Sequence, residues 1–108
     1  MGLEATTDNF DDMVIKSEVL TLVDFWGPKC IRCLQLMPFV EKLVQENEGQ
    51  VKLVKVEAPK NRRLCLNLRL LSLPAFLFYR DGKEIGRLAG EGVTEEQLRE
   101  TLAKLMSR

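Results

Sequence analysis

The chemistry of this chain is concentrated in the motif Cys30-Ile31-Arg32-Cys33, which lies between an apolar run and a long helical pattern. The first turn of a helix has unpaired backbone N–H groups and a partial positive charge, so a sulfur placed there is favoured as a thiolate. The thiolate is the reactive form of cysteine, and the second sulfur follows about one helical turn later, within disulfide reach. The spacing therefore predicts a redox-active pair of thiols.

The composition limits the other kinds of chemistry. The 108 residues fit one domain, residues 1–108, and the 16 basic and 16 acidic side chains cancel. This balance indicates no general affinity for nucleic acid or for an anionic membrane, and no apolar stretch approaches the ~20 residues that span a bilayer. The chain has no histidine, which excludes histidine bases and histidine-containing metal sites.

Cysteine usage indicates the compartment. Three cysteines cannot all pair within one chain, and residues 1–6 lack the apolar core of a secretory signal. A reducing compartment with a working C-x-x-C fits better than a framework of structural disulfides. We therefore expect a cytoplasmic protein.

The cysteine pair needs a strand before it and a helix after it, and the hydrophobic pattern provides both. Residues 19–25 form a nearly continuous β-branched and aromatic run, which suits a strand buried on both faces of a sheet. A helix is predicted from Cys30 to a stop at Asn47-Glu48-Gly49. Pro38 lies inside this helix, where its missing N–H should produce a kink.

Further elements are predicted along the chain. Strands are expected over residues 51–56, 75–79 and 84–89, with a short one over residues 3–5. Other local signals predict a first helix around Phe10, Met13 and Val14 capped by Thr7 or Asp8, a helix with Leu64, Leu68 and Leu71 on one face, a hairpin turn at Asp81-Gly82, and a capping box from Thr94 to Gln97 for the last helix. This order predicts an α/β domain with helices on both faces of a central sheet.

These elements and several spaced residues resemble the thioredoxin family. The resemblance covers residues 7–106. It rests on Val23-Asp24-Phe25-Trp26, Pro28, the C-x-x-C, Pro38, Lys55, Ser72-Leu73-Pro74, Asp81-Gly82 and Gly90. It implies the thioredoxin fold, a central five-stranded mixed sheet flanked by four helices. It also implies thiol–disulfide oxidoreductase activity, with no cofactor beyond the Cys30–Cys33 disulfide.

The resemblance gives roles to individual residues. Cys30 is similar to the exposed nucleophile that attacks a protein disulfide, and Cys33 to the resolving thiol that releases the reduced client. Asp24 matches a buried carboxylate that takes up the proton of the resolving thiol, with Lys55 as its expected charge partner. A carboxylate inside an apolar run is also anomalous on physical grounds, because its burial costs several kcal/mol.

The same resemblance implies a groove for an extended client polypeptide beside a cis-proline at Pro74. The expected groove residues are Trp26, Lys29, Ile31, Arg32, Leu73, Pro74 and Gly90. The expected partners are disulfide-containing client proteins and a reductant of the thioredoxin-reductase type, and the family default is a monomer.

The chain departs from the family at the redox motif. The family usually has Gly-Pro between the cysteines and an aromatic residue before them, whereas this chain has Ile31-Arg32 and Lys29. Two added cations favour the Cys30 thiolate, so we expect a reduction potential above the about −270 mV of thioredoxin. If both side chains extend into water, screening removes most of this effect. Lys29 also favours acidic client segments and puts recognition by a standard reductase in doubt.

Two other functions fit parts of the pattern. A redox-inert binding module would use the groove beside Pro74, although such modules commonly lose a cysteine, the buried acid or the proline, all of which are present here. A metal or iron–sulfur site would need a further ligand, because the C-x-x-C and Cys65 supply at most three thiolates.

Cys65 and the charged run at residues 60–63 can each be interpreted as structural or as functional. Cys65, beside Leu64 and Leu68, has the pattern of a small buried apolar residue, and the alternative is a partly exposed thiol open to glutathionylation. The run Lys60-Asn61-Arg62-Arg63 is typical of a solvated helix start, and the alternative is a surface for a partner.

Overall fold

The computed structural model describes residues 3–107, which form a five-stranded mixed sheet in the order β1-β3-β2-β4-β5. Strands β1 (Leu3–Ala5) and β2 (Leu20–Trp26) both run parallel to β3 (Val51–Glu57). Strand β4 (Ala75–Arg80) is antiparallel to β2, and β5 (Lys83–Ala89) is antiparallel to β4. The predicted mixed sheet is confirmed.

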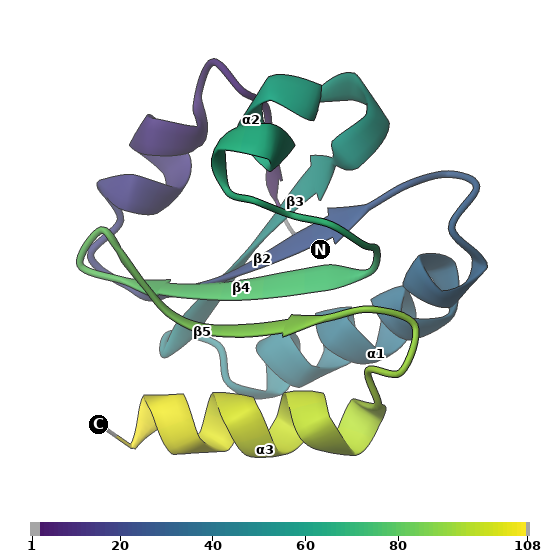
Figure 1. The fold of residues 1–108 in the computed structure, drawn as a ribbon. Helices are drawn as coiled ribbons and strands as arrows, with labels where there is room; N and C mark the ends of the chain where they lie inside the picture. The colour runs from purple at the N-terminus through teal and green to yellow at the C-terminus, as the bar shows by residue number, and fades with distance from the viewer. Residues whose placement is uncertain (1–2, 108) are drawn as a thin grey trace.

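Helices cover both faces of this sheet (Figure 1). Helices α1 (Ile31–Glu46) and α3 (Glu95–Met106) lie on one face. The short helical segment η1 (Asp11–Ile15) and helix α2 (Arg62–Asn67), which follows the turn η2 (Ala58–Lys60), lie on the other. The predicted α/β class, with four helices around the sheet, is confirmed for the described residues.

The sheet separates two apolar layers, and β2 contributes to both because its side chains alternate between the faces. Leu20 and Leu22 join the layer under α1 and α3, whereas Val23 and Phe25 join the layer under η1 and α2. Burial on both faces explains why this stretch reads as a continuous apolar run. Thr21 and Asp24 are the buried polar residues of this strand, and Asp24, the one with an ionisable side chain, lies six residues before Cys30.

Helix α2 is shorter than predicted. It ends at Asn67, and Arg69 follows with a positive φ of 58°. Leu71 is 96% exposed, so the prediction that it shares a buried helical face with Leu64 and Leu68 is wrong. The helix ends before it reaches Leu71, the last residue of the apolar pattern. Contacts with another part of the fold stabilise the turn around Arg69 that follows it.

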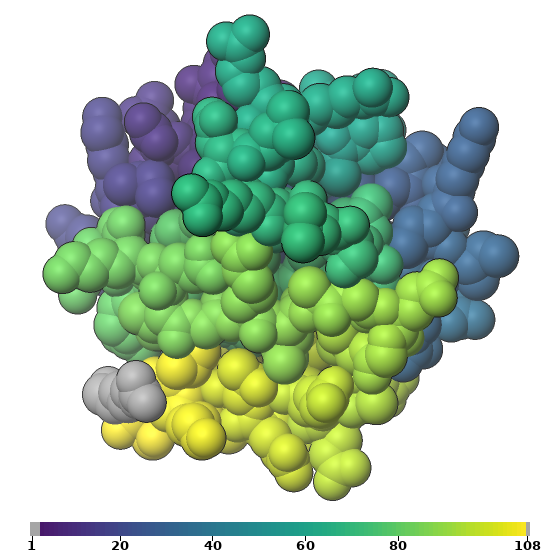
Figure 2. Space-filling view, in the orientation of Figure 1, coloured from purple at the N-terminus to yellow at the C-terminus, as the bar shows by residue number. Residues whose placement is uncertain are grey.

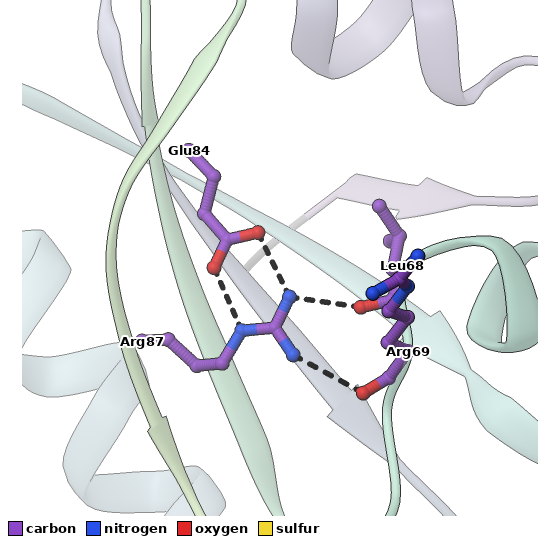
Figure 3. A network of polar contacts seen from close by, with 4 residues as sticks. All are labelled: Leu68, Arg69, Glu84 and Arg87. Carbon is purple, nitrogen blue, oxygen red and sulfur yellow. Dashed lines mark hydrogen bonds and ion pairs between the residues drawn. The ribbon is translucent and has the colours of Figure 1, made fainter.

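Arg87 on β5 supplies those contacts (Figure 3). Its guanidinium donates to both carboxylate oxygens of Glu84, at 2.7 and 2.8 Å. It also donates to the backbone carbonyls of Leu68, at 2.9 Å, and of Arg69, at 3.3 Å. One side chain therefore binds two carbonyl groups of the turn that follows α2.

The start of the chain also differs from prediction. Neither Thr7 nor Asp8 caps η1, which begins after Phe10 without a side-chain cap. The Thr7 backbone N–H instead donates to Oδ1 of Asn61 at 2.8 Å, and Asn61 donates to the Glu57 carbonyl at 2.9 Å. Asn61 is buried, so the predicted solvated run at residues 60–63 is wrong at this residue, although its three charged neighbours are exposed.

Two local predictions are confirmed. Asp81 and Gly82 form the β4–β5 turn with φ values of 54° and 81°, which the Asp-Gly pair adopts readily. Thr94 and Gln97 form both hydrogen bonds of the capping box at the start of α3, at 3.0 and 3.1 Å. Helix α1 continues through Pro38, and the kink there stays a prediction. No helix within residues 3–107 is long and apolar enough to cross a bilayer.

Candidate active site

The two cysteines of the motif form a disulfide at the start of α1, with their Cα atoms 5.3 Å apart. Cys30 is the N-cap residue, and its Sγ accepts a hydrogen bond of 3.2 Å from the backbone N–H of Cys33. The Cys30 backbone N–H donates to the Gly27 carbonyl at 3.0 Å, which fixes the turn between β2 and α1. The predicted position at the helix N-terminus is confirmed, and a thiolate at Cys30 would receive this N–H bond.

The two sulfur-bearing residues differ in exposure. Cys33 is buried at 1% exposure, whereas Cys30 is half-buried and Ile31, beside it, is 74% exposed. A client disulfide can therefore approach Cys30 more readily than Cys33.

Asp24 is buried in the middle of β2, at 1% exposure. Neither of its carboxylate oxygens has a hydrogen-bond partner among the described residues. Burial raises the pKa of Asp24 from 3.8 to about 7; Lys55 opposes this rise, while Glu41 and Glu4 add to it. The carboxyl group can therefore change its protonation state near neutral pH.

Lys55 is opposite Asp24 on β3, but it does not bond to it. The two residues are register partners in the parallel β2–β3 pair, and the Lys55 ammonium forms its ion pair with Glu41 of α1. The positive charge of Lys55 lowers the pKa of Asp24 through space, and its role as the charge partner of Asp24 in the reaction stays a prediction. Glu41 was not predicted, although it lies eight residues after Cys33, about two helical turns along the same face of α1.

Backbone and side-chain contacts bring several of the predicted groove residues together. The Leu73–Pro74 peptide bond is cis, and the Gly90 N–H donates to the Pro74 carbonyl at 2.8 Å. The Val93 N–H donates to Gly90 at 3.2 Å, and the Arg32 guanidinium donates to the Val93 carbonyl at 2.8 Å. These bonds join the redox motif to the segments around Pro74 and Gly90. Val93 is an unpredicted member of this set, since an apolar residue bound through its backbone leaves no sequence signal.

The remaining predicted groove residues lie around the motif. Lys29 is exposed in the turn before Cys30. The Leu73 side chain lies close to Gly27, since a β-carbon added at Gly27 would be 3.5 Å from Cδ1 of Leu73. Trp26 ends β2, and its buried indole N–H has no hydrogen-bond partner within residues 3–107.

Cys65 is separate from the disulfide. It is half-buried and packs against the apolar layer that contains Leu64 and Leu68, and its Sγ lies 3.9 Å from the Ala58 carbonyl. Burial raises the pKa of its thiol, which makes it harder to ionise. Among the described residues, no three histidine, cysteine or acidic side chains are grouped as a metal site would need.

The geometry defines a class of protein: an α/β domain with an internal disulfide at a helix N-terminus, near a backbone segment with a cis-proline. The family model named Thioredoxin matches residues 2–104. The chain belongs to the thioredoxin family, whose members are disulfide oxidoreductases, and it is an oxidoreductase of that type.

Relatives of similar length support this assignment. The chain is 32% identical to "Thioredoxin 1" of Nostoc sp. over 101 residues, which cover 94% of each chain. It is 34% identical to "Thioredoxin 1" of Synechococcus elongatus, over 93% of this chain and 94% of that protein. It is 30% identical to "Thioredoxin" of Porphyra purpurea, over 99% of this chain and all of that protein.

Proposed function

We propose that the chain reduces protein disulfides, with Cys30 as the nucleophile and Cys33 as the resolving thiol. The difference in exposure between the two residues carries this assignment, because a mixed disulfide with a protein client needs an accessible sulfur. The helix N-terminus and the Cys33 N–H both favour negative charge on Cys30.

The reaction consists of two thiol–disulfide exchanges. The Cys30 thiolate attacks one sulfur of the client disulfide, the client S–S bond breaks, and the other client sulfur leaves as a thiolate. The Cys33 thiolate then attacks Cys30, and the second client sulfur leaves. Two electrons pass to the client, the Cys30–Cys33 disulfide forms, and two protons end on the client thiols.

We assign Asp24 as the group that accepts the proton of Cys33. A buried carboxyl group whose pKa is raised to about 7 can take up or release a proton near neutral pH. Lys55 and Glu41 tune this pKa in opposite directions, so they are positioning residues of the site.

Trp26, Lys29, Ile31, Arg32, Leu73, Pro74 and Gly90 are proposed to line the client groove. The proposed partners are disulfide-containing proteins and a reductant of the thioredoxin-reductase type, with no further cofactor. We propose that the protein acts as a single-domain monomer. We also propose that it is cytoplasmic, because its dithiol needs a reducing compartment to be regenerated.

A redox titration of the disulfide tests this function. The protein is equilibrated in dithiothreitol or glutathione buffers and read by the mass shift on alkylation. A reversible two-electron couple between about −300 and −180 mV is expected. The Cys33→Ser variant should trap a mixed disulfide with a client, and Cys30→Ser should not. The absence of a reversible couple would contradict the proposal and favour a redox-inert binding module.

A further inference from the structure

An apolar hollow lies beside the redox motif, on the face of the sheet that carries α2. It has a volume of about 600 Å³. It is lined by Ala58, Pro59, Arg62, Cys65, Leu66, Leu70, Leu71, Ser72 and Leu73. Leu66 and Leu71, two of its lining residues, are 76% and 96% exposed, which places large apolar side chains in water beside an open hollow.

Two residues that line the hollow, Pro59 and Leu73, lie close to Gly27, three residues before Cys30. A β-carbon added at Gly27 would contact both Leu73 and Pro59, at 3.5 and 3.6 Å. Gly27 also accepts the hydrogen bond of the Cys30 N–H. A polypeptide bound at Cys30 can therefore extend from the sulfur into the hollow, and Figure 2 shows the lining segment between α2 and β4 on the viewer's face, in teal and green.

The charge around the hollow is mostly positive, although Glu57 precedes the lining residue Ala58 and forms an ion pair of 3.8 Å with Lys60. Residues 25–40 and 58–80 contain no acidic residue, although the whole chain has 16 of them. The cations of these two stretches are Lys29, Arg32, Lys60, Arg62, Arg63, Arg69 and Arg80. Arg62 is the charged residue among those that line the hollow, and it is exposed. Acidic residues do occur on the other side of the motif, where Glu91 follows Gly90.

The far wall of the hollow is held in place. Arg87 binds the Leu68 and Arg69 carbonyls, immediately before the lining residues Leu70 and Leu71 (Figure 3). The N-terminal end is held by Asn61, which precedes Arg62 and is bonded to Thr7 and Glu57. A cavity whose two ends are fixed can select a side chain with little ordering cost.

We propose that this hollow is a specificity pocket for clients, and that it takes a large apolar side chain followed or preceded by an acidic residue. The apolar side chain lies against Leu66 and Leu71, and the neighbouring carboxylate pairs with Arg62. This inference rests on the proposed function, since it specifies which protein disulfides Cys30 attacks most rapidly. The charge complementarity favours an acidic polypeptide segment as the occupant.

Reduction of model peptides tests the pocket. Each peptide carries one cysteine in a disulfide with glutathione, and a Leu-Glu pair at successive positions on either side of it. Matched peptides carry Ser-Gln or Leu-Lys instead. The rate of Cys30–Cys33 disulfide formation is measured at low and high salt. At the best position, the Leu-Glu peptide should react about five- to tenfold faster than Ser-Gln, as expected for burial of part of a leucine side chain.

Matched variants locate the effect. Leu71→Ser and Leu66→Ser should remove most of the preference for leucine, whereas Leu3→Ser, at a 52% exposed residue on β1, should not. Arg62→Gln should remove most of the preference for Glu over Lys at low salt, and Arg63→Gln, at the adjacent exposed residue, should preserve most of it. The uncharged bis(2-hydroxyethyl) disulfide, which offers neither a large apolar side chain nor a carboxylate, should react equally with all of these variants.

Several outcomes would overturn the proposal. Equal rates for all three peptides, or equal losses in the pocket and control variants, would show that the hollow selects nothing. Salt-dependent binding of an oligonucleotide that Arg62→Gln abolishes, without a peptide preference, would make this a nucleic-acid surface. Failure of the parent protein to react even with oxidised glutathione would instead contradict the oxidoreductase function itself.

Discussion

Asp24 and Lys55 face each other as register partners on β2 and β3, yet the Lys55 ammonium is bonded to Glu41 of α1. The buried Asp24 carboxyl group therefore has a cation nearby but no hydrogen-bond donor of its own among the described residues. Burial raises the pKa of Asp24 most, and the opposite charges of Lys55 and Glu41 then lower and raise it. This arrangement makes the protonation of Asp24 sensitive to a pair of residues outside the redox motif.

Asp24→Asn should stabilise the protein at alkaline pH. The pKa of Asp24 is raised from 3.8 to about 7 in the folded state, so the folded state binds a proton more tightly than the unfolded state does. The stability of the parent protein therefore falls as the pH rises from about 4 to about 7 and is then level. Asp24→Asn should lack this fall. At pH values above the folded-state pKa of about 7, its free energy of unfolding should therefore exceed that of the parent protein by up to roughly 4 kcal/mol. Urea unfolding of the oxidised proteins at several pH values measures the difference.

The control for this effect is a carboxyl group on the surface. Glu96→Gln, at an exposed residue of α3, should leave the pH dependence unchanged. If Asp24→Asn and the parent protein showed parallel stability curves across this pH range, Asp24 would not be a buried acid with a raised pKa.

Substitutions at Glu41 and Lys55 should move the pKa of Asp24 in opposite directions. Glu41→Gln removes a negative charge that raises this pKa, and it should lower it; Lys55→Met removes the opposing cation and should raise it further. Carboxyl-carbon NMR of Asp24 during a pH titration gives both values. Glu46→Gln, at an exposed residue in the same helix, is the matched control, and shifts of the same sign in the first two variants would contradict the electrostatic account.

The reduction potential of the Cys30–Cys33 couple should lie above about −270 mV, and Lys29→Gln should lower it. Lys29 is exposed in the turn before Cys30, where its positive charge favours the reduced, thiolate form. The decrease should be at most about 30 mV for each pKa unit by which the thiolate is destabilised, and it should shrink in high salt. A glutathione-buffer titration measures it, with Lys42→Gln as the control.

Arg32 should behave differently from Lys29. Its guanidinium is bonded to the Val93 carbonyl, so Arg32→Gln loses a link to the Gly90 segment as well as a charge. The rate with an extended peptide client should therefore fall more than the rate with oxidised glutathione. An equal change in both rates would indicate that Arg32 acts through its charge alone.

Arg87→Ala should destabilise the fold by roughly 1–2 kcal/mol, because several carbonyl and carboxylate groups lose a charged donor while remaining partly accessible to water. Arg87→Lys should recover little of this loss, since an ammonium cannot reproduce the bidentate contact with Glu84. Thermal unfolding compares both with Arg63→Ala, an exposed arginine on α2. A loss no larger than that control would contradict a stabilising role for the network.

The elements that follow from local patterns were predictable from the sequence. The buried run of β2, the Asp81-Gly82 turn and the Thr94–Gln97 capping box each depend on residues close together in the chain. The position of the dithiol also follows from the motif at the strand–helix junction. The end of α2 was not predictable from the sequence, because Leu71 continues the apolar spacing of Leu64 and Leu68. The turn that follows the helix is held by Arg87, which comes from β5.

The charge network of the site was predicted only in part. Asp24 is conspicuous because a carboxylate in an apolar run needs an explanation, and Lys55 matches the family pattern. Nothing local connects Lys55 to Glu41, since the pair joins β3 to α1 and depends on how that helix lies on the sheet. The hydrogen bond from Arg32 to the Val93 carbonyl could not be predicted from the sequence either, because its acceptor is a backbone atom 61 residues away.

The central place of β2 in the sheet also has a consequence during synthesis of the protein. Both of its neighbours, β3 and β4, follow it in the chain, and β4 begins only at Ala75. Since a chain leaves the ribosome from its N-terminus, Cys30 and Cys33 emerge before the strands that enclose Asp24 exist. The nascent thiols are therefore unprotected for much of translation, and faithful production of the enzyme depends on surroundings that keep cysteines from pairing with other chains.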